Sequence, residues 1–453
     1  MRRPADTPRR LLLALGLAGL LAAGPAWSID LLESWRQALA KNPAWLAARA
    51  QAEAERQELP LARSQLLPNL SWSMSRFKND LESRNKNILG QTVTSESEYF
   101  SHNKTLTLRQ PLFRPQLYYG YRQAEYVVEA AEARLDQSAQ ELAVKVGGAY
   151  FETLLAQDQL DLVRAQVAAT EGLRKSAQAG FEKGTGTRTD IDEAQSRLDL
   201  SLAEQVVAEQ ALLVARHQLE ALIDGPVESL ARLDPARLPL QTAEAARLED
   251  WVAKAEAVNP ELRSLAASIA AAERDLSKQR AGHLPTVDLV AQKTDAQSDN
   301  PTSANSGYDN TMVGVQVSIP LFAGGHTSAS TDRARAALNR FRHEYESRRL
   351  DVGVRVRREF QAVAEGQFKV RAYEQAERSA RQLIVSTEKG ILAGTRTQID
   401  LLNAEQQLML ARRDLARARY DFIMARLRLH ALAGSVDEDL LLSINGALGT
   451  VGG

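Results

Sequence analysis

Two stretches of this chain read almost identically: GTRTDID at residues 186–192 and GTRTQID at residues 394–400, a displacement of 208 positions. Three pairs of shorter motifs recur at displacements of 217 or 209 positions: Asn42-Pro43 with Asn259-Pro260, Leu67-Pro68 with Leu284-Pro285, and Pro111-Leu112-Phe113 with Pro320-Leu321-Phe322. A long internal period of this kind indicates a duplicated structural unit. We therefore expect a first repeat at 29–240, a second at 241–435, and a C-terminal tail at 436–453.

Residues 1–28 have the features of a secretory signal peptide. An apolar run from Leu11 to Ala23 lies between a basic segment and the small-residue cleavage site Ala26-Trp27-Ser28. The pair Arg9-Arg10 leaves a twin-arginine signal as a less favoured alternative. The apolar run has about 13 residues, fewer than the ~20 that a membrane-spanning helix needs. We expect the mature chain to start near Ile29 and to enter a membrane, if at all, by closed β-strands.

The composition excludes several classes of function. The chain has no cysteine, which rules out disulfides, thiol catalysis and a lipid anchor on an N-terminal cysteine. A net charge of −1 provides no basic surplus for binding nucleic acid. The six histidines are too scattered for a metal site, and no nucleophile–base pair or phosphate-binding loop stands out. We therefore expect neither an enzyme nor a bound cofactor or metal.

Long helices are indicated by tracts that are rich in Ala, Leu, Gln, Glu and Arg and free of proline. Two such tracts occupy about 115–183 and 326–392. Each is followed, after the glycine-threonine motif, by another tract, at about 189–223 and 397–432. A helix over the first tract would be about 100 Å long, at 1.5 Å per residue. Helices alone would also fit a soluble periplasmic coiled-coil scaffold.

Strands are predicted where apolar and polar residues alternate. Four segments show this pattern, at about 69–80, 99–111, 286–296 and 310–320, with polar loops expected at 81–98 and 297–309. In the last segment we expect the apolar side chains to face lipid: Val313, Val315, Val317 and Ile319. Four strands cannot close a barrel, because about eight are needed. Several chains must therefore combine, and three of them would supply twelve strands.

This order of elements resembles the TolC family of outer-membrane efflux and secretion ducts over about residues 30–435. The resemblance rests on the duplicated helix-strand-strand-helix order, the Asn-Pro and Leu-Pro pairs 25 residues apart, the strand-ending Pro-Leu-Phe, and Gly-Thr-Arg-Thr-x-x-Asp at 394–400. It implies a mostly α-helical fold with a small β part. The expected assembly is a homotrimer, in which a twelve-stranded outer-membrane β-barrel continues into a long periplasmic α-helical barrel.

The same resemblance implies that the two glycine-threonine turns form a gate at the periplasmic end. Asp400 would contribute to a ring of carboxylates in the pore, and Asn403 stands where the family has a second aspartate. Arg396 would latch the gate by binding Thr189 and Asp190 on the other turn. A family tyrosine that shares this task is replaced by Ile391.

The turns also contain residues that would serve simply as helix caps. A Thr-x-x-Asp pair close to a capping box occurs in each turn, and a glycine precedes it where the preceding helix must end. The candidates are Gly186, Thr189 and Asp192 in the first turn and Gly394, Thr397 and Asp400 in the second. Helix capping alone remains an alternative to the gate.

The resemblance finally implies a passive exit duct in the outer membrane of a Gram-negative cell. An inner-membrane ABC or proton-driven transporter would supply the energy, and a periplasmic adaptor protein would link it to the duct. Type I protein secretion is the favoured system, because the cysteine that anchors a branch of the efflux ducts to lipid is absent. Export of small molecules by a multidrug efflux pump is the alternative, and the coiled-coil scaffold is a distant one.

Overall fold

The computed structural model describes residues 28–86, 88–240, 247–298 and 306–449, so the expected signal peptide, apart from Ser28, lies outside the described part. The chain divides into two compact units. The helical unit combines Met1–Arg49, Asp136–Asn259 and Leu350–Gly453, and the sheet unit combines Ala50–Leu135 with Pro260–Arg349. Each unit therefore contains segments of both repeats. None of the described helices is long and apolar enough to cross a membrane.

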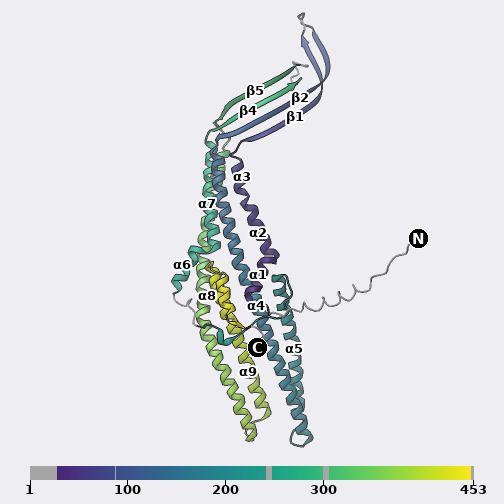
Figure 1. Cartoon of the computed structure of the whole chain (residues 1–453), viewed down its shortest axis with the longest axis vertical. Helices are drawn as coiled ribbons and strands as arrows, with labels where there is room; N and C mark the ends of the chain where they lie inside the picture. The colour runs from purple at the N-terminus through teal and green to yellow at the C-terminus, as the bar shows by residue number, and fades with distance from the viewer. Residues whose placement is uncertain (1–27, 87, 241–246, 299–305, 450–453) are drawn as a thin grey trace, which may run out of the picture. The chain divides into compact units, whose positions relative to one another are not determined.

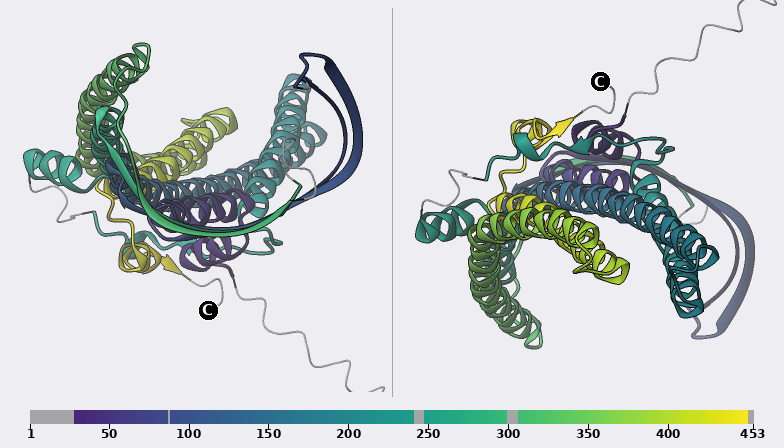
Figure 2. Two further views of the ribbon diagram at one scale, coloured as in Figure 1. Left: turned by 90° about the horizontal axis from the view of Figure 1, so that it is seen from above. Right: turned by 90° about the horizontal axis from the view of Figure 1, so that it is seen from below.

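The sheet unit contains four antiparallel strands in the order β1-β2-β4-β5 (Figure 1). They span Asn69–Lys86 (β1), Thr92–Phe113 (β2), Thr286–Gln297 (β4) and Gly307–Ser318 (β5). Each repeat contributes one hairpin, and the pairing of β2 with β4 joins the two hairpins. The sheet is strongly curved when it is seen from above (Figure 2). The two repeats thus meet in one continuous curved sheet.

The first hairpin is longer than the sequence predicted. Instead of a polar loop at 81–98, β1 continues to Lys86 and β2 begins at Thr92. Much of the extension is polar and lacks regular alternation, but the two strands stay paired from Leu81 with Ser97 to Lys86 with Thr92. In the second hairpin β5 ends at Ser318, so Ile319 lies just beyond the strand. The loop expected at 297–309 falls largely outside the described residues.

The two faces of the sheet differ in polarity. Residues directly opposite each other on neighbouring strands share a face, and the register places these apolar residues together: Leu70, Trp72, Met74, Leu106, Leu108, Leu289, Ala291, Val313 and Val315. The other face is mostly polar: Ser71, Ser73, Thr105, Thr107, Asp288, Gln292 and Thr294. Val313 is 71% exposed, whereas Thr294 is 7% exposed. The apolar face is therefore uncovered within the chain, whereas the polar face is covered at β4 and exposed along the edge strand β5.

A buried carboxylate anchors the end of the sheet from which the long helix α4 departs. Asp288 on β4 is 2% exposed and binds two guanidinium groups. Arg109 on β2 donates from Nε to Oδ2 at 3.1 Å, and Arg114, just before α4, donates from Nε to Oδ1 at 2.7 Å. An unpaired buried charge is strongly destabilising, so the carboxylate needs these partners. The cluster therefore ties β2 of the first repeat to β4 of the second.

The described helices of the sheet unit that precede the strands are the end of α2 (Pro43–Arg56), α3 (Glu58–Ser64) and α7 (Pro260–Arg280). Two long helices follow them, α4 (Pro115–Glu182) with 68 residues and α8 (His326–Leu392) with 67. Within the sheet unit α7 packs on the first part of α8 through a small apolar cluster: Ala272, Leu276, Ala334 and Leu338. Alanines at two of these positions permit a close approach of the two helices.

The core of the helical unit involves α4, α5 (Arg188–Ile223) and α9 (Gln398–Leu432), with α1 (Leu31–Lys41) and α6 (Leu248–Val258) in the same unit. Its largest fully buried side chains include Tyr150, Phe151, Leu154, Leu219, Phe422, Leu427 and Leu441. A glycine allows α4 to approach α9 closely, because a Cβ on Gly147 would lie 2.6 Å from Leu427 Cδ2. The long helices are therefore tightly packed at this level.

The C-terminal tail is folded into the helical unit rather than extended from it. Its helix α10 (Glu438–Asn445) buries Leu441, and β6 (Leu448–Gly449) pairs with β3 (Arg232–Leu233). Tyr150 on α4 donates its hydroxyl hydrogen to the carbonyl of Ala231 at 2.8 Å. Burial raises the pKa of Tyr150, so this hydroxyl remains a donor. These contacts link the tail and the inter-repeat segment to the long helices.

Candidate functional site at the helical tips

Two tight turns end α4 and α8 and lead into α5 and α9 (Figure 1). The two turns have the same hydrogen bonds, and equivalent residues are 210 positions apart, as Thr185 and Thr395 are. The repeated sequence GTRT indicates a displacement of 208 positions instead. The backbone N–H groups of Thr185 and Thr395 each donate to a glycine carbonyl five residues earlier, at 2.9 and 2.8 Å. Gly184 and Gly394 occupy equivalent positions, with φ of +73° and +70°, where a side chain would be strained.

The displacement seen in the structure changes the role of one predicted residue. Gly184 makes the left-handed turn that was expected of Gly186. Gly186 instead occupies the position that Arg396 has in the second turn. A Cβ on Gly186 would lie 3.1 Å from the backbone nitrogen of Phe181, so the first turn leaves little room for a side chain there. The shared motif is therefore Gly-Thr-x-Thr-x-x-Asp, which starts at Gly184 and at Gly394.

Both α5 and α9 begin with a capping box. In the first, Asp190 N donates to Thr187 Oγ1 at 3.2 Å while Thr187 N donates to Asp190 Oδ2 at 2.8 Å. In the second, Thr397 and Asp400 make the same two bonds at 3.2 and 2.9 Å. The expected use of Asp192 in the first cap is wrong, because Asp190 stands at the third helical position, where the side chain can reach back.

The cap bonds also set the charge of the tips. The backbone N–H of Thr187 lowers the pKa of Asp190, and that of Thr397 lowers the pKa of Asp400. In both cases the threonine hydroxyl adds a second hydrogen bond to the carboxylate, at 2.8 and 3.0 Å. Both aspartates are therefore ionised at neutral pH.

The latch expected at Arg396 is not formed within this chain. Arg396, in the turn before α9, has its Nη1 3.8 Å from Asp400 Oδ1 in the first turn of that helix, and its side chain is 58% exposed. The Asp190 carboxylate is bonded to Thr187, and the structure does not bring Arg396 to Thr189 or Asp190. An exposed pair of this kind contributes little stability. Arg396 is therefore associated with Asp400 and not with the other turn.

The two tips are bridged instead by Arg197, which sequence reasoning missed. Arg197 on α5 donates from Nη2 to Glu193 at 2.9 Å, one turn earlier, and from Nη1 to Asn403 Oδ1 on α9 at 3.5 Å. No local sequence pattern distinguishes Arg197 from the many other arginines on these helices. Asn403, expected as a neutral member of a pore ring, acts here as a hydrogen-bond acceptor.

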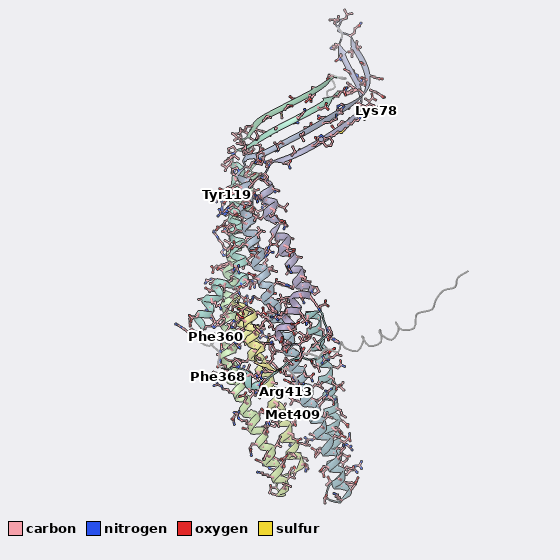
Figure 3. The ribbon with its side chains drawn as sticks, in the orientation of Figure 1. Lys78, Tyr119, Phe360, Phe368, Met409 and Arg413 are labelled. Atoms are coloured by element: carbon pink, nitrogen blue, oxygen red, sulfur yellow. The ribbon has the colours of Figure 1, made fainter. Side chains whose placement is uncertain are left out.

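Cavities follow the seam between the α4–α5 and α8–α9 tips. One of about 380 Å³ lies between the turns and is lined by residues that include Asp190, Arg197 and Thr397. A second of about 490 Å³ shares Arg197 and Leu402 with the first. A third of about 520 Å³ shares Met409 with the second, and Met409 is labelled on α9 in Figure 3. The tips are therefore incompletely packed against each other.

The second cavity holds carboxylates without a basic partner. Glu204 on α5 and Glu405 on α9 both line it, and neither forms an ion pair with any residue in the described part of the chain. Burial raises the pKa of Glu405, and the nearby carboxylate of Glu388 raises it further. Across the described ranges no group of three His, Cys, Asp or Glu side chains could hold a metal ion.

A stronger polar contact joins α4 and α9 elsewhere in the helical unit. Tyr420 on α9 donates to Asp158 Oδ2 on α4 at 2.7 Å, and its ring lies 5.7 Å from that of Phe151. Burial raises the pKa of Asp158 and that of Tyr420. The helix α9 is thus firmly connected to α4 here, whereas the Arg197–Asn403 bond that connects it to α5 at the tips is weak.

Comparison with known proteins identifies the family to which this architecture belongs. The model of the family described as "Outer membrane efflux protein" matches residues 35–225 and 251–435. The chain belongs to this family. It is 36% identical over 440 residues to the alkaline protease secretion protein AprF of Pseudomonas aeruginosa, covering 95% of this chain and 90% of AprF. It is 29% identical to the outer membrane protein TolC of Vibrio cholerae, covering 93% and 94% of the two chains.

Solved structures agree on the fold. The outer membrane protein VceC of Vibrio cholerae superimposes with a TM-score of 0.76, covering 89% of this chain and 96% of VceC, at 17% sequence identity. The expected TolC-type architecture, mostly helical with a small sheet part, is therefore confirmed. The chain is an outer-membrane export channel with a periplasmic helical part, as the sequence analysis predicted.

Proposed function

We propose that this chain forms a homotrimeric, passive exit duct for type I protein secretion. The similarity over nearly the whole chain to AprF, a protein named for the secretion of alkaline protease, supports protein as the cargo. In this proposal an inner-membrane ABC transporter drives export, and a periplasmic adaptor connects it to the duct. Small-molecule efflux is the alternative, and the description of the family as efflux proteins favours it.

The observation that supports a trimer is the open four-stranded sheet. Within the described strands β1 and β5 stand at the two ends of the order, so each has an edge that no strand of this chain pairs. Unpaired edges cannot face hydrocarbon, where every backbone group needs a partner. Pairing β5 of one copy with β1 of the next would satisfy both edges. Three copies would then close a barrel of about twelve strands, above the usual minimum of about eight.

The polarity of the sheet supports the orientation of this barrel. Val313, Val315 and Val317 lie on the exposed apolar face and would contact lipid, with Ile319 just below the end of β5. The polar face, with Asp288 and Thr294, would line the water-filled lumen. The first Pro-Leu-Phe segment ends β2, and the second follows β5. Both would lie near the periplasmic membrane interface, where aromatic residues are common.

The helical tips are proposed to form the constriction at the periplasmic end. Threefold symmetry would place three Asp400 carboxylates around one axis, and the lowered pKa keeps them charged. Asn403, one turn further along α9, adds no charge. Arg396, 3.8 Å from Asp400, would reduce the local negative potential. Thr189 and Asp190 would belong to the facing tip.

A secretion assay tests the proposal. The chain is produced in a Gram-negative cell that lacks its own TolC-type ducts, together with an ABC transporter, an adaptor and a secreted protease from a type I system. Protease should appear in the medium only when the chain is present, and the chain should be extracted by detergent as a trimer. Drug resistance restored without secretion would favour efflux. A stable monomer, or recovery in the soluble periplasm, would contradict the duct.

A further inference from the structure

Arg197 makes a polar bridge between two hairpins that are otherwise separated by cavities at the tips. Its side chain is 30% exposed, and Glu193 holds the guanidinium by one nitrogen at 2.9 Å. The other terminal nitrogen reaches Asn403 on α9 at 3.5 Å. Arginine suits this position because its planar fork can bond two acceptors at once. The bridge is long and ends on a neutral amide, so it is weak and easily broken.

The side chain also lies where two cavities meet. Arg197 lines both the cavity of about 380 Å³ between the turns and the adjoining cavity of about 490 Å³. Space on both sides leaves the guanidinium room to move without repacking the helices. A well-packed side chain would lack this freedom.

The larger cavity offers the guanidinium a second set of acceptors. Glu204 and Glu405 line it together with Arg197 and have no basic partner in the described residues. The other arginine of this cavity, Arg412, is already paired with Glu377 at 3.1 Å. Burial, and then the neighbouring carboxylate of Glu388, raise the pKa of Glu405. A guanidinium that moved beside Glu405 would oppose both effects by stabilising the charged carboxylate.

We propose that Arg197 is a two-position latch: it bridges to Asn403 when the tips are closed and moves to Glu405 when they open. The inference deepens the proposed gate and rests on it. It assigns to α5 the task that the family resemblance gives to Arg396, which lies beside Asp400 here. The neutral Asn403 is what makes release possible, because a carboxylate at this position would hold the arginine more strongly.

Single-channel recording in planar bilayers tests the latch on purified trimers. Asn403→Ala should raise the open-to-closed ratio by at least about 10-fold, because the three weak bridges of the closed position are lost together. Arg197→Ala removes the arginine from both positions, so its ratio should stay well below that of Asn403→Ala. Asn403→Ala should change nothing further in the Arg197→Ala background, since the arginine that it bonds is already gone. Glu405→Gln should lower the ratio, because the open position loses its charged acceptor.

Arg164→Ala is the matched control. Arg164 pairs with Glu209 at 3.3 Å within the α4–α5 hairpin, so its loss removes a similar ion pair without touching the seam. A wild-type ratio in Asn403→Ala, an effect of Asn403→Ala that persists in the Arg197→Ala background, or an unchanged ratio in Glu405→Gln would each overturn the latch.

Asp400→Ala separates failure of the latch from failure of the gate. If the latch test fails while Asp400→Ala still weakens block by cations, the tips are the constriction and the latch alone is wrong. If Asp400→Ala leaves the block unchanged, the proposed gate fails as well.

Discussion

Replacing Val315 by arginine should prevent assembly of the duct, whereas the same change at Gln316 should be tolerated. Val315 is 59% exposed, lies opposite Leu289 and belongs to the apolar face of the sheet. Gln316 lies opposite Asp288 on the polar face. If the apolar face contacts lipid, Val315→Arg places a charge in hydrocarbon and Gln316→Arg places one in water. The two neighbouring positions therefore make a matched pair.

The size of the effect follows from the position of the strand. An arginine near the bilayer midplane costs about 2–4 kcal/mol on the lipid face of an outer-membrane barrel. At 1.4 kcal/mol per factor of ten, this lowers the folded-to-unfolded ratio by roughly 30- to 700-fold for one chain. A trimer carries the substitution three times, so the total is roughly 6–12 kcal/mol, comparable with the stability of a whole domain.

The assay is the amount of detergent-extracted trimer in outer-membrane fractions, relative to the total amount of chain produced. Val315→Arg should leave little trimer, and Gln316→Arg should leave close to the wild-type amount. Loss of trimer to the same extent in both variants would refute the assigned faces. Normal trimer in Val315→Arg would refute contact of this strand with lipid.

Three further changes probe the tips and the helical unit. Asp400→Ala should weaken block of the conductance by multivalent cations, because it removes symmetry-related carboxylates from the constriction; unchanged block would contradict the ring. Thr397→Ala should cost about 0.5–2 kcal/mol of local helix stability, because it removes the N-terminal cap of α9. Hydrogen exchange at the start of α9 should then be faster. Thr189→Ala is the control and should have little effect, because Thr189 is not part of the capping box of α5. Asp158→Asn should remove a pH dependence of thermal stability. The buried carboxyl has a raised pKa, so its contribution is most favourable below the unfolded-state value of 3.8 and is lost as pH rises through the folded-state pKa. Melting curves that fall equally with pH in both proteins would contradict this assignment.

The sequence by itself determined which elements form. Proline-free tracts of helix-favouring residues predicted the long helices now seen as α4 and α8, because helix formation depends on local composition and on the absence of breakers. Alternation located the apolar part of each strand, since side chains on a strand point to opposite faces in turn. The order of these elements was also enough to recognise the family.

Sequence motifs and alternation predicted the wrong residues for a turn, a helix cap and a loop, because these depend on backbone hydrogen bonds. The repeated letters aligned Gly186 with Gly394, but the left-handed turn lies at Gly184, and the cap uses Asp190 instead of Asp192. The polar end of the first hairpin was taken for a loop, because cross-strand pairing and not alternation stabilises it. In both cases the deciding hydrogen bonds cannot be read from spacing alone.

The tertiary structure alone decided which distant residues meet. Asp288 binds Arg109 and Arg114, more than 170 positions earlier in the chain. Arg197 reaches Asn403 across 206 positions, and the tail buries Leu441 in the helical unit. Such contacts arise when packing brings two elements together. The sequence around an arginine or a glutamate does not indicate which distant residue it will contact. The sequence therefore determined the elements, and packing determined the candidate latch and the charges around it.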